Sequence, residues 1–543
     1  MNQLDTLTVA ITSFKREWHL ERAIASARNA GIRRLVVATS EPTPGILRIL
    51  DREKEGWLSF DVAGTRDDIG CNSTWMLAAY RSRTDRILLL HDDDVILPEF
   101  GEAYCRRMAP MLDAGVGFVS WRANHLFDDG TTHVTEYWTG PTRVAQSKEL
   151  ERLVARFGAL SLSPIVSVLD RTTIIRACKE AEETLTHNEC LYRPGMLLGT
   201  EILVYLRHIK AKPTWFYMDE LLTMYGHTES SGTVQVEKTG NISSLVKGYD
   251  RARVQGVMHR APSPKPKIIL VHGYGLPPAD DAERQRMANA AYSREHHFGQ
   301  FDMIDREVFP GDIHRTSSDL GDSRPTVYLR DYLDLGCEMA LPEDIVAFTN
   351  SDIGLTGDAA ARILAGVERG RGVTVCPRRV LDHPAQGRIY RSVRNCKVDG
   401  GMDVIAVSPH WWDAMKDAMP DMLLGREAWD LCFRTLAEEW IDGPAMKSAL
   451  TIIPSDWWIS RAYTDDVCWH EPHDSFWKTD RSANLGGAHN RALARKFFEA
   501  RRNLMGLACV AEPASNKIEP TADGSIVSTV PSSDGERDTK ATD

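Results

Sequence analysis

The first half of the chain alternates short apolar runs with longer stretches of helical periodicity. The apolar runs have the length of strands and are Leu7–Ile11, Leu35–Ala38, Ile87–Leu90 and Gly117–Trp121. Between them, Trp18–Ala30 and Cys71–Arg81 space their apolar residues as amphipathic helices do. Strands that alternate with helices in this way predict a doubly wound, mostly parallel sheet.

The second half begins a new alternation of the same kind. Lys267–His272 is expected to be a strand closed by glycines, Asp281–His296 a long helix and Asp344–Thr349 a buried strand. Val373–Cys376 and Val404–Val407 are expected to add two more strands. The chain is therefore expected to be α/β, with two tandem Rossmann-like domains.

Composition gives the domain boundaries. Residues 260–267 read Arg-Ala-Pro-Ser-Pro-Lys-Pro-Lys, which is typical of a stiff, basic linker. After Val510 the chain shifts to Ser, Thr, Pro, Asp and Glu, a composition that favours disorder. We therefore expect one domain over residues 1–258, a second over 264–510, and a disordered acidic tail over 511–543.

The overall composition is that of an ordinary globular protein. Of the 543 residues, 43% are hydrophobic and 26% are charged, so the chain can bury more than one core. A formal net charge of -11 does not attract polyanions, and nucleic-acid or anionic-membrane binding would need a local basic patch. The 10 cysteines form no Cys-x-x-Cys pair, which favours reduced thiols. Without a signal peptide or an apolar run of ~18 residues, a cytoplasmic location is expected.

Acidic residues directly follow the buried run Ile87–Leu90, in the order His91-Asp92-Asp93-Asp94. Ligands bind at the carboxyl edge of a parallel sheet, and residues two positions apart along a strand share a face. Asp92 and Asp94 have that spacing and could hold Mg²⁺ or Mn²⁺, which prefer oxygen ligands together with substrate phosphates. A solvated acidic turn is the alternative interpretation of so short a motif.

Several stretches of the first half together resemble the GT-A glycosyltransferases, specifically the family-2-like enzymes. The matching stretches are Thr8–Arg16, Gly70–Asn72, Ile87–Pro98, Leu198–Glu201 and Leu221–His227 with Ser230 and Ser231. The resemblance covers residues 6–235. It implies a GT-A fold, a nucleotide-sugar donor, a divalent cation and, as in most of this family, direct displacement with inversion at the sugar.

The resemblance also implies a role for each matching residue. Asp92 and Asp94 would hold Mn²⁺ or Mg²⁺, with His227 as a third ligand or a diphosphate contact. Glu201 would take the proton from the acceptor hydroxyl, which requires hydrogen-bond reach. The residues implied at the nucleotide are Thr12, Ser13, Arg16, Asp68 and Asp93. The alternatives are a helix-start carboxylate for Glu201 and a surface carboxylate for Asp68.

The second half is also similar to GT-A glycosyltransferases, of a different branch. The matching stretches are Ile345–Ile353, Met402–Val407, Leu424–Asp430 and Cys468–Asp474. Asn350 stands where the first carboxylate of the strand-end motif is expected. The implied site residues are Asp352 and His470 for the metal and Asp430 for the base, with His473 and Glu427 as alternatives. A degenerate domain that only packs or grips an acceptor is the competing interpretation.

One stretch of the second half is strongly basic. Its cationic residues are Arg378, Arg379, Arg388, Arg391, Arg394 and Lys397. Arginine forks suit phosphate, and the target could be a nucleotide diphosphate, a lipid diphosphate or nucleic acid. A solvated basic loop is the alternative.

These features favour a metal-dependent, inverting and bifunctional glycosyltransferase of polysaccharide or glycan synthesis. Its partners would be a nucleotide-sugar donor and a glycan or other hydroxyl acceptor. Sugar transfer to modified bases of nucleic acid ranks lower, because no recognition motif accompanies the basic stretch. A nucleotide-sugar-binding protein with one inactive domain is the third hypothesis. A nucleotidyltransferase is disfavoured, because the chain has no glycine-rich loop of the kind that holds a nucleoside triphosphate.

Overall fold

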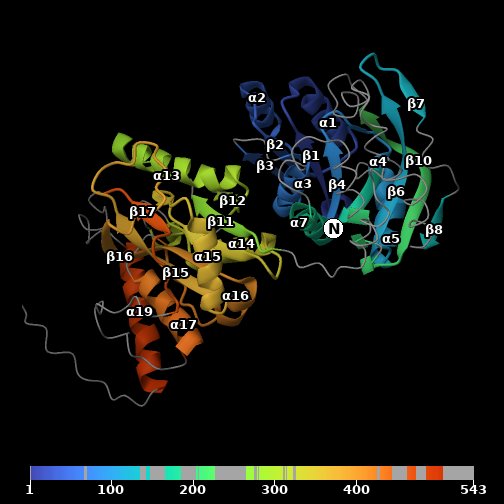
Figure 1. Ribbon diagram of the computed structural model, residues 1–543. Helices are drawn as coiled ribbons and strands as arrows, with labels where there is room; N and C mark the ends of the chain where they lie inside the picture. Colours follow the sequence, from blue (N-terminus) through green and yellow to red (C-terminus); the bar gives the residue numbers. More distant parts are fainter. Residues whose placement is uncertain are drawn as a thin grey trace, which may run out of the picture. The chain divides into compact units, whose positions relative to one another are not determined.

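We describe the protein from a computed structural model. The described residues are 2–65, 70–134, 142–146, 166–184, 204–205, 207–208, 210–226, 265–273, 278, 280–309, 312–313, 315–321, 326–424, 428–442, 461–472 and 485–504. The chain divides into two units, Met1–Ala494 and Arg495–Asp543. The first unit contains two separate sheets, one built from residues of each half of the sequence (Figure 1).

The first sheet is doubly wound at one side and mixed at the other. Its strands are β1 (Leu7–Ser13), β2 (Arg34–Ser40), β3 (Ser59–Thr65), β4 (Arg86–His91), β5 (Val95–Ile96), β6 (Phe118–Leu126), β7 (Thr132–Val134), β8 (Arg143–Gln146), β9 (Ser167–Asp170) and β10 (Thr214–Gly226). The order is β3-β2-β1-β4-β9-β6-β10-β5, with β7 beside β6 and β8 beside β10. Strands β3, β2, β1 and β4 run parallel, so their carboxyl ends lie at one edge.

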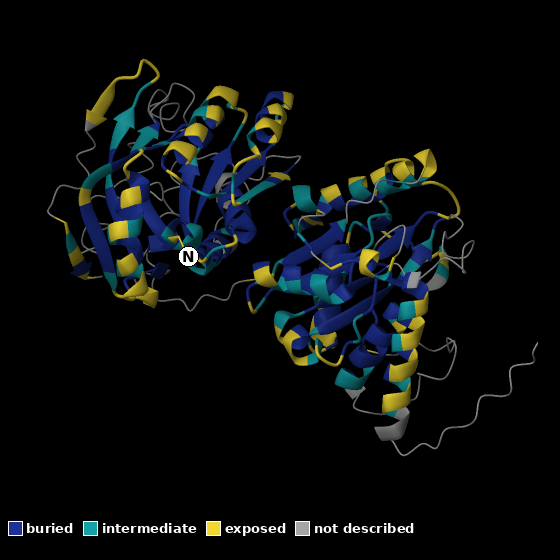
Figure 2. Ribbon diagram, turned by 180° about the vertical axis from the view of Figure 1, so that it is seen from behind, coloured by how far each residue is buried: buried dark blue, intermediate teal, exposed yellow. Residues whose placement is uncertain are grey.

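Helices accompany this sheet in the alternating order that the sequence predicts. They are α1 (Glu17–Asn29), α2 (Pro44–Glu53), α3 (Gly70–Arg81), α4 (Phe100–Ala103), α5 (Ala109–Asp113) and α7 (Arg171–Thr184). The apolar faces of α1 and α2 join the core formed by β1, β2 and β4. Figure 2 shows the buried strands inside and the exposed residues along the outer faces of these helices.

The second sheet repeats this plan with fewer parallel strands. Its strands are β11 (Ile268–Gly273), β12 (Met303–Val308), β13 (Ile345–Thr349), β14 (Ile353–Leu355), β15 (Val373–Val380), β16 (Lys397–Val407) and β17 (Cys468–His470). The order is β12-β11-β13-β16-β15-β17-β14. Strands β12, β11 and β13 are parallel, whereas β16 runs antiparallel to both β13 and β15.

The helices of the second half are longer and again alternate with strands. They are α13 (Asp281–Gly299), α14 (Leu329–Met339), α15 (Ala359–Arg369), α16 (Pro409–Met415), α17 (Trp429–Asp442) and α19 (Leu485–Leu504). Asp280 caps α13 by accepting a hydrogen bond from the Glu283 amide, and Ser408 caps α16 in the same way from Trp411. Such caps satisfy amide groups that the first helical turn leaves without partners.

The expected α/β class is confirmed, with two sheets of Rossmann-like topology. Parallel pairing is concentrated around β1 and β11, and antiparallel strands complete each sheet. The domain boundaries stay a prediction, because the Pro-rich stretch at 260–264 and the tail at 511–543 lie outside the described residues. None of the helices in the described part of the chain combines the length and the hydropathy that a bilayer crossing requires.

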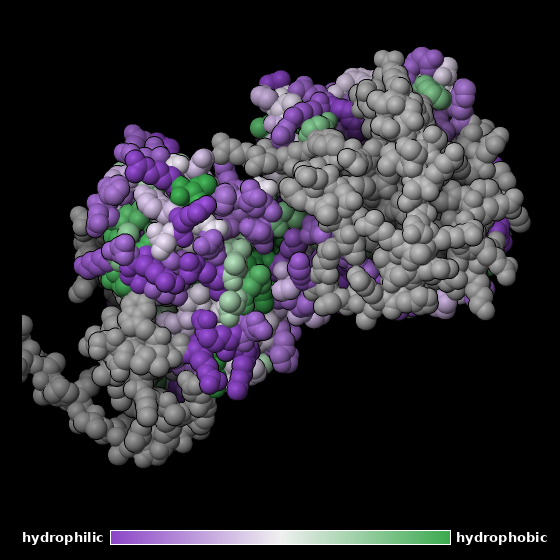
Figure 3. All heavy atoms as spheres, viewed as in Figure 1, coloured by the Kyte–Doolittle hydropathy of each residue, from purple (hydrophilic) through white to green (hydrophobic). Residues whose placement is uncertain are grey.

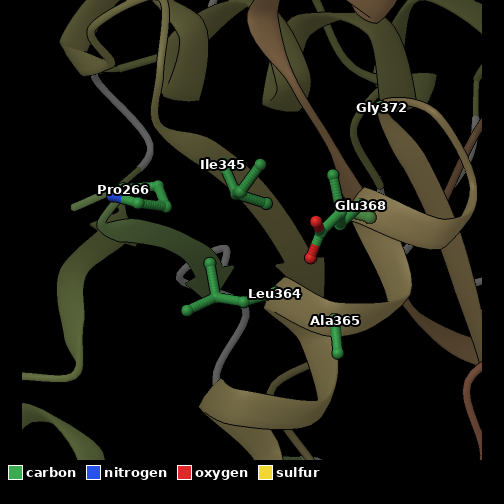
Figure 4. A pocket seen from close by; sticks show the side chains of 7 residues that line it. Pro266, Ile345, Leu364, Ala365, Glu368 and Gly372 are labelled. Atoms are coloured by element: carbon green, nitrogen blue, oxygen red, sulfur yellow. The ribbon is translucent and has the colours of Figure 1, made fainter. Parts of the chain in front are cut away.

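The described surface is mainly hydrophilic in the view of Figure 3, with hydrophobic side chains in separate patches. One concave region of the second half is apolar, a cavity of about 440 Å³ beside α15 (Figure 4). Its lining residues are Pro266, Ile345, Leu364, Ala365, Val367, Glu368 and Gly372. Glu368 is the one charged side chain among them, so this cavity offers little polar chemistry, and the candidate sites lie at the strand ends described next.

Candidate active sites at two strand ends

The first candidate site forms where β1 and β4 end side by side. Their parallel register places Thr12 opposite His91, and the Asp92 amide donates to the Thr12 carbonyl oxygen at 3.0 Å. The loop after β1 therefore meets the acidic stretch after β4, although the residues in contact are 77 to 79 positions apart in sequence. All three carboxylates of this stretch are buried.

Asp92 binds the loop after β1. Its Oδ2 accepts hydrogen bonds from the Ser13 hydroxyl at 2.9 Å and from the Phe14 amide at 3.1 Å. Its other oxygen pairs with the Arg16 guanidinium. Burial raises the pKa of Asp92 to about 6, against the opposing effect of Arg16. Asp92 therefore fixes the position of the loop that the sequence predicts at the nucleotide.

Asp93 makes a second contact to the same loop. Its Oδ2 accepts from the Arg16 Nη1 at 2.6 Å, while its main-chain oxygen accepts from Arg22 of α1 at 2.7 Å. Burial alone would lower the pKa of Arg16, but the charges of Asp92 and Asp93 raise it above its ordinary value. A single guanidinium thus bridges two adjacent carboxylates.

Asp94 connects β4 to the end of β10. Its Oδ1 accepts from the Gly226 amide at 2.9 Å, and its Oδ2 accepts from the His91 amide at 2.8 Å. A Cβ atom at Gly226 would lie only 2.3 Å from the Asp93 carbonyl oxygen, so a side chain does not fit there. The glycine lets the backbone of β10 approach the acidic stretch closely.

One group of three side chains here could hold a cation. Ligand atoms of His91, Asp93 and Asp94 all lie within 4.8 Å of one another. The His91 ring stacks on Trp75 with 5.8 Å between centroids, and burial lowers the pKa of His91. The imidazole is therefore held neutral, which is the form that binds metals. Two carboxylates and an imidazole fit Mn²⁺, which accepts both oxygen and nitrogen ligands.

The structure brings together six of the residues that the sequence predicts for the first site. They are Thr12, Ser13, Arg16, Asp92, Asp93 and Asp94. Of the two predicted metal ligands, Asp94 belongs to the group that could hold a cation, whereas Asp92 pairs with Arg16 and Asp93, predicted at the nucleotide, stands in that group. Asp68, Glu201 and His227 lie outside the described residues. Sequence reasoning did not single out His91 as a ligand, although it directly precedes the acidic stretch. It also did not single out Gly226, whose only sequence signal is its place directly before His227.

The second candidate site forms around the end of β13. Strand β14 pairs antiparallel with β17, so Ile353 lies opposite His470 and Asp352 lies beside it. The His470 Nε2 is 3.1 Å from Asp352 Oδ2, which joins the two residues that the sequence predicts as ligands. Arg294 of α13 donates to the carbonyl oxygens of Ser351 and Ile353 at 3.0 and 2.8 Å, and so fixes this turn.

Asp403 of β16 lies at the same strand end and is buried. Its Oδ1 accepts from the Asn350 amide nitrogen at 3.2 Å, and its Oδ2 accepts from the Arg378 Nη1 of β15 at 2.9 Å. Burial raises the pKa of Asp403, while Arg378 and His470 oppose that rise and Asp352 adds to it. Arg378, His470 and Asp352 are therefore all close enough to Asp403 to influence its charge.

Asp430 lies in the first turn of α17, as predicted. Burial, and then the charge of Asp403, raise the pKa of Asp430 to about 6. A carboxylate in that range can accept a proton near neutral pH, as a general base must. The alternative residues Glu427 and His473 lie outside the described residues.

The basic stretch of the second half divides into two kinds of arginine. Arg378 pairs with Asp403, and Arg379 pairs with Asp465 at 2.5 Å, so both are held within the protein. In contrast, Arg388 and Arg391 are exposed. The stretch is therefore not one continuous phosphate-binding loop.

Comparisons with known proteins add no family assignment. No protein-family model matches the sequence, and no curated protein matches it. Among solved structures, S. aureus TarS 1–349 has a TM-score of 0.32 and 12% identity, covering 47% of this chain and 69% of that chain. TarS 1–349 in complex with UDP-GlcNAc has a TM-score of 0.31 and 12% identity, covering 47% and 70%. Function is therefore inferred from the two strand ends themselves.

Proposed function

We propose that this protein is a glycosyltransferase that moves a sugar from a nucleotide-sugar donor to an acceptor hydroxyl. The observation that carries the proposal is the convergence of His91, Asp93, Asp94 and Arg16 where β4 and β1 end. In doubly wound sheets, nucleotide ligands bind outside the carboxyl ends of the strands.

The electrostatics of the first strand end support a donor that brings a cation with it. Asp92, Asp93 and Asp94 are 0%, 3% and 1% exposed, and burying charge costs several kcal/mol per ion. Arg16 offsets part of that cost through Asp92 and Asp93. Mn²⁺ or Mg²⁺ held by His91, Asp93 and Asp94 would offset the rest and, when bound, would neutralise the departing diphosphate.

The residues of the chain divide the remaining work. Arg16, with Thr12 and Ser13 beside it, would orient the nucleotide against the loop after β1. Glu201 would accept the proton of the attacking hydroxyl, with inversion at the anomeric carbon, as the resemblance of its motif implies. A positioned general base contributes typically ~10²–10⁴-fold to such a reaction.

The second half would carry a second transfer site, which makes the enzyme bifunctional. Asp352, His470 and Asp430 are the residues proposed for it, because Asp352 and His470 lie 3.1 Å apart beside β13 and Asp430 is influenced by the charges of Asp403 and Arg378. Asp430 is the proposed base. Polysaccharide or glycan synthesis would use two such sites on a growing chain.

A donor screen tests the proposal directly. The full-length protein is incubated with a panel of nucleotide-sugars and Mn²⁺, and release of the nucleoside diphosphate is measured with and without EDTA. We expect turnover of at least one donor and loss of first-half turnover in EDTA. Absence of both donor binding and turnover across the panel would exclude a transferase and leave a scaffold protein.

A further inference from the structure

The end of β13 differs from that of β4 in its charge. At β13 the first motif position is Asn350, an amide, where β4 carries a carboxylate. The His91 group is the one set of three ligand atoms within 4.8 Å among the residues that the structure describes. At β13, Asp352 and His470 contribute two such atoms, 3.1 Å apart. Among the described residues, this strand end therefore has no such group of three ligand atoms, and the nearby Asp403 carboxylate is already engaged by Arg378 and Asn350.

A guanidinium lies at this strand end, as Arg16 does at β4, but no group of three cation ligands in the described part of the chain accompanies it. Arg378 enters from β15, and its side chain is 22% exposed, so solvent and ligands can reach it. Asp403 holds the guanidinium through Nη1 at 2.9 Å, and the same carboxylate holds Asn350 at 3.2 Å. One buried carboxylate thus positions both a cation and a neutral amide from two neighbouring strands.

The Arg378 guanidinium lies against the backbone at Gly401. A Cβ atom at Gly401 would lie 2.9 Å from the Arg378 Cζ and 3.0 Å from its Nε. The guanidinium therefore packs close to the backbone of β16, and a side chain at position 401 would displace it. Asp403 fixes its direction through the hydrogen bond from Nη1.

We propose that the second site binds the diphosphate of its donor through Arg378, positioned by Asp403 and Gly401, without requiring a divalent cation. This inference rests on the proposed nucleotide-sugar site of the second half. A planar guanidinium presents several donors in a fixed geometry that matches phosphate oxygens, and ordering it in advance reduces the entropy lost on binding. Asp403 is a positioning residue, because it acts on the ligand through Arg378 and Asn350.

The test uses the full-length chain with Asp94→Asn, which weakens the first site. UDP, GDP, ADP and CDP are titrated by calorimetry in EDTA and, separately, in Mn²⁺. We expect one of them to bind in EDTA, and Arg378→Lys in this background to weaken that binding about tenfold or more, the scale of a charge-assisted hydrogen bond. Gly401→Ala should weaken it too, because the new Cβ displaces the guanidinium while every charge remains.

Arg388→Lys is the matched control, because this exposed arginine lies ten positions after Arg378 in the same basic stretch. It should leave the affinity unchanged, and thermal unfolding of each variant checks that the fold survives. Binding that needs Mn²⁺ and ignores Arg378→Lys would overturn this inference while leaving a second nucleotide site in place. If no nucleotide binds in EDTA or in Mn²⁺, both this inference and the second nucleotide site are overturned. The first site is tested separately, by donor turnover of the wild-type protein.

Discussion

The ends of β4 and β13 occupy equivalent places in the two sheets but differ in charge. Each strand has a parallel neighbour on one side, β1 or β11, and an antiparallel neighbour on the other, β9 or β16. Each is followed by a short strand, β5 or β14, that pairs antiparallel with a strand from late in its half. The similar topology places polar residues at the same edge in both halves.

The side chains gathered at each edge make the difference. At β4, three carboxylates meet one guanidinium and a neutral imidazole. At β13, Asp352 meets His470, while Asp403 of the neighbouring strand holds both the Asn350 amide and the Arg378 guanidinium. The shared topology therefore places polar residues at the same edge in both halves, and we propose that the side chains gathered there determine whether a cation or a guanidinium faces the phosphates of a donor.

The largest expected effect is from Asp94→Asn. An asparagine can accept with one oxygen only, whereas Asp94 accepts from both Gly226 and His91. Mn²⁺-dependent donor binding to the first site should disappear in calorimetry, while binding to the second site remains. Asp51→Asn, at an exposed carboxylate of α2, is the control. Wild-type Mn²⁺-dependent affinity in Asp94→Asn would remove the first site from this strand end.

Glu201→Gln should separate binding from chemistry in the first half. Donor binding by calorimetry should remain, while transfer falls by ~10²-fold or more, the scale of a missing general base. The measurement is made with Asp430→Asn in the background, so that the second half contributes no turnover. If transfer in that background is unaffected, another residue removes the acceptor proton.

Gly226→Ala should weaken the first site without changing any charge. The new Cβ would meet the Asp93 carbonyl oxygen at 2.3 Å, so β10 or the acidic stretch must move. We expect Mn²⁺-dependent affinity to fall about tenfold, since small displacements of positioned groups are costly. Gly130→Ala serves as the comparison, because a Cβ there meets nothing within 4 Å, although its positive φ also strains alanine. Equal affinities in the two variants would contradict the proposed close approach.

The pH dependence should distinguish the second half. Burial and then Asp403 raise the pKa of Asp430 to about 6, with Arg378 opposing. A base must be deprotonated, so second-half transfer should be half-maximal near pH 6, reach a plateau above about pH 7 and be about tenfold lower at pH 5 than at the plateau. Between about pH 4 and 6 the folded state binds more protons at Asp430 than the unfolded state, so the free energy of unfolding contributed by this group falls as pH rises.

Denaturant titrations of Asp430→Asn at several pH values test whether Asp430 lowers the free energy of unfolding as pH rises. In the variant, the free energy of unfolding should fall less steeply between pH 4 and pH 6 than in the wild type, because the contribution of Asp430 is absent. Transfer activity that stays flat across this range in the wild-type second half would show that a group with a different pKa is the base.

The smallest expected effect is from the exposed arginines. Arg388→Ala with Arg391→Ala removes two positive charges from the basic stretch but no contact at the end of β13. Donor binding should be the same in the wild type and the double variant, and neither protein should bind DNA. Strong, salt-dependent DNA binding that this pair of changes abolishes would instead favour transfer to nucleic acid.

The sequence by itself determined the α/β class and the strand that ends in each site. Burial and helix periodicity are local properties, so alternation along the chain is enough to predict β1, α1, β4 and β13. It also determined that Asp92–Asp94 lie at the carboxyl edge of the sheet, because they directly follow a buried strand. The resemblance to GT-A glycosyltransferases placed Thr12, Ser13 and Arg16 at the nucleotide, and the parallel register of β1 and β4 brings them to the same edge.

Tertiary structure alone decided which side chains complete each site. Gly226 reaches Asp94 across 132 residues, and Asn350 reaches Asp403 across 53. Neither pairing has a local pattern, because each depends on strand register and on which strand lies next to which. The same reason explains why Arg378 could not be told from Arg388 in sequence: one lies on β15 against Gly401 and Asp403, and the other is exposed to solvent.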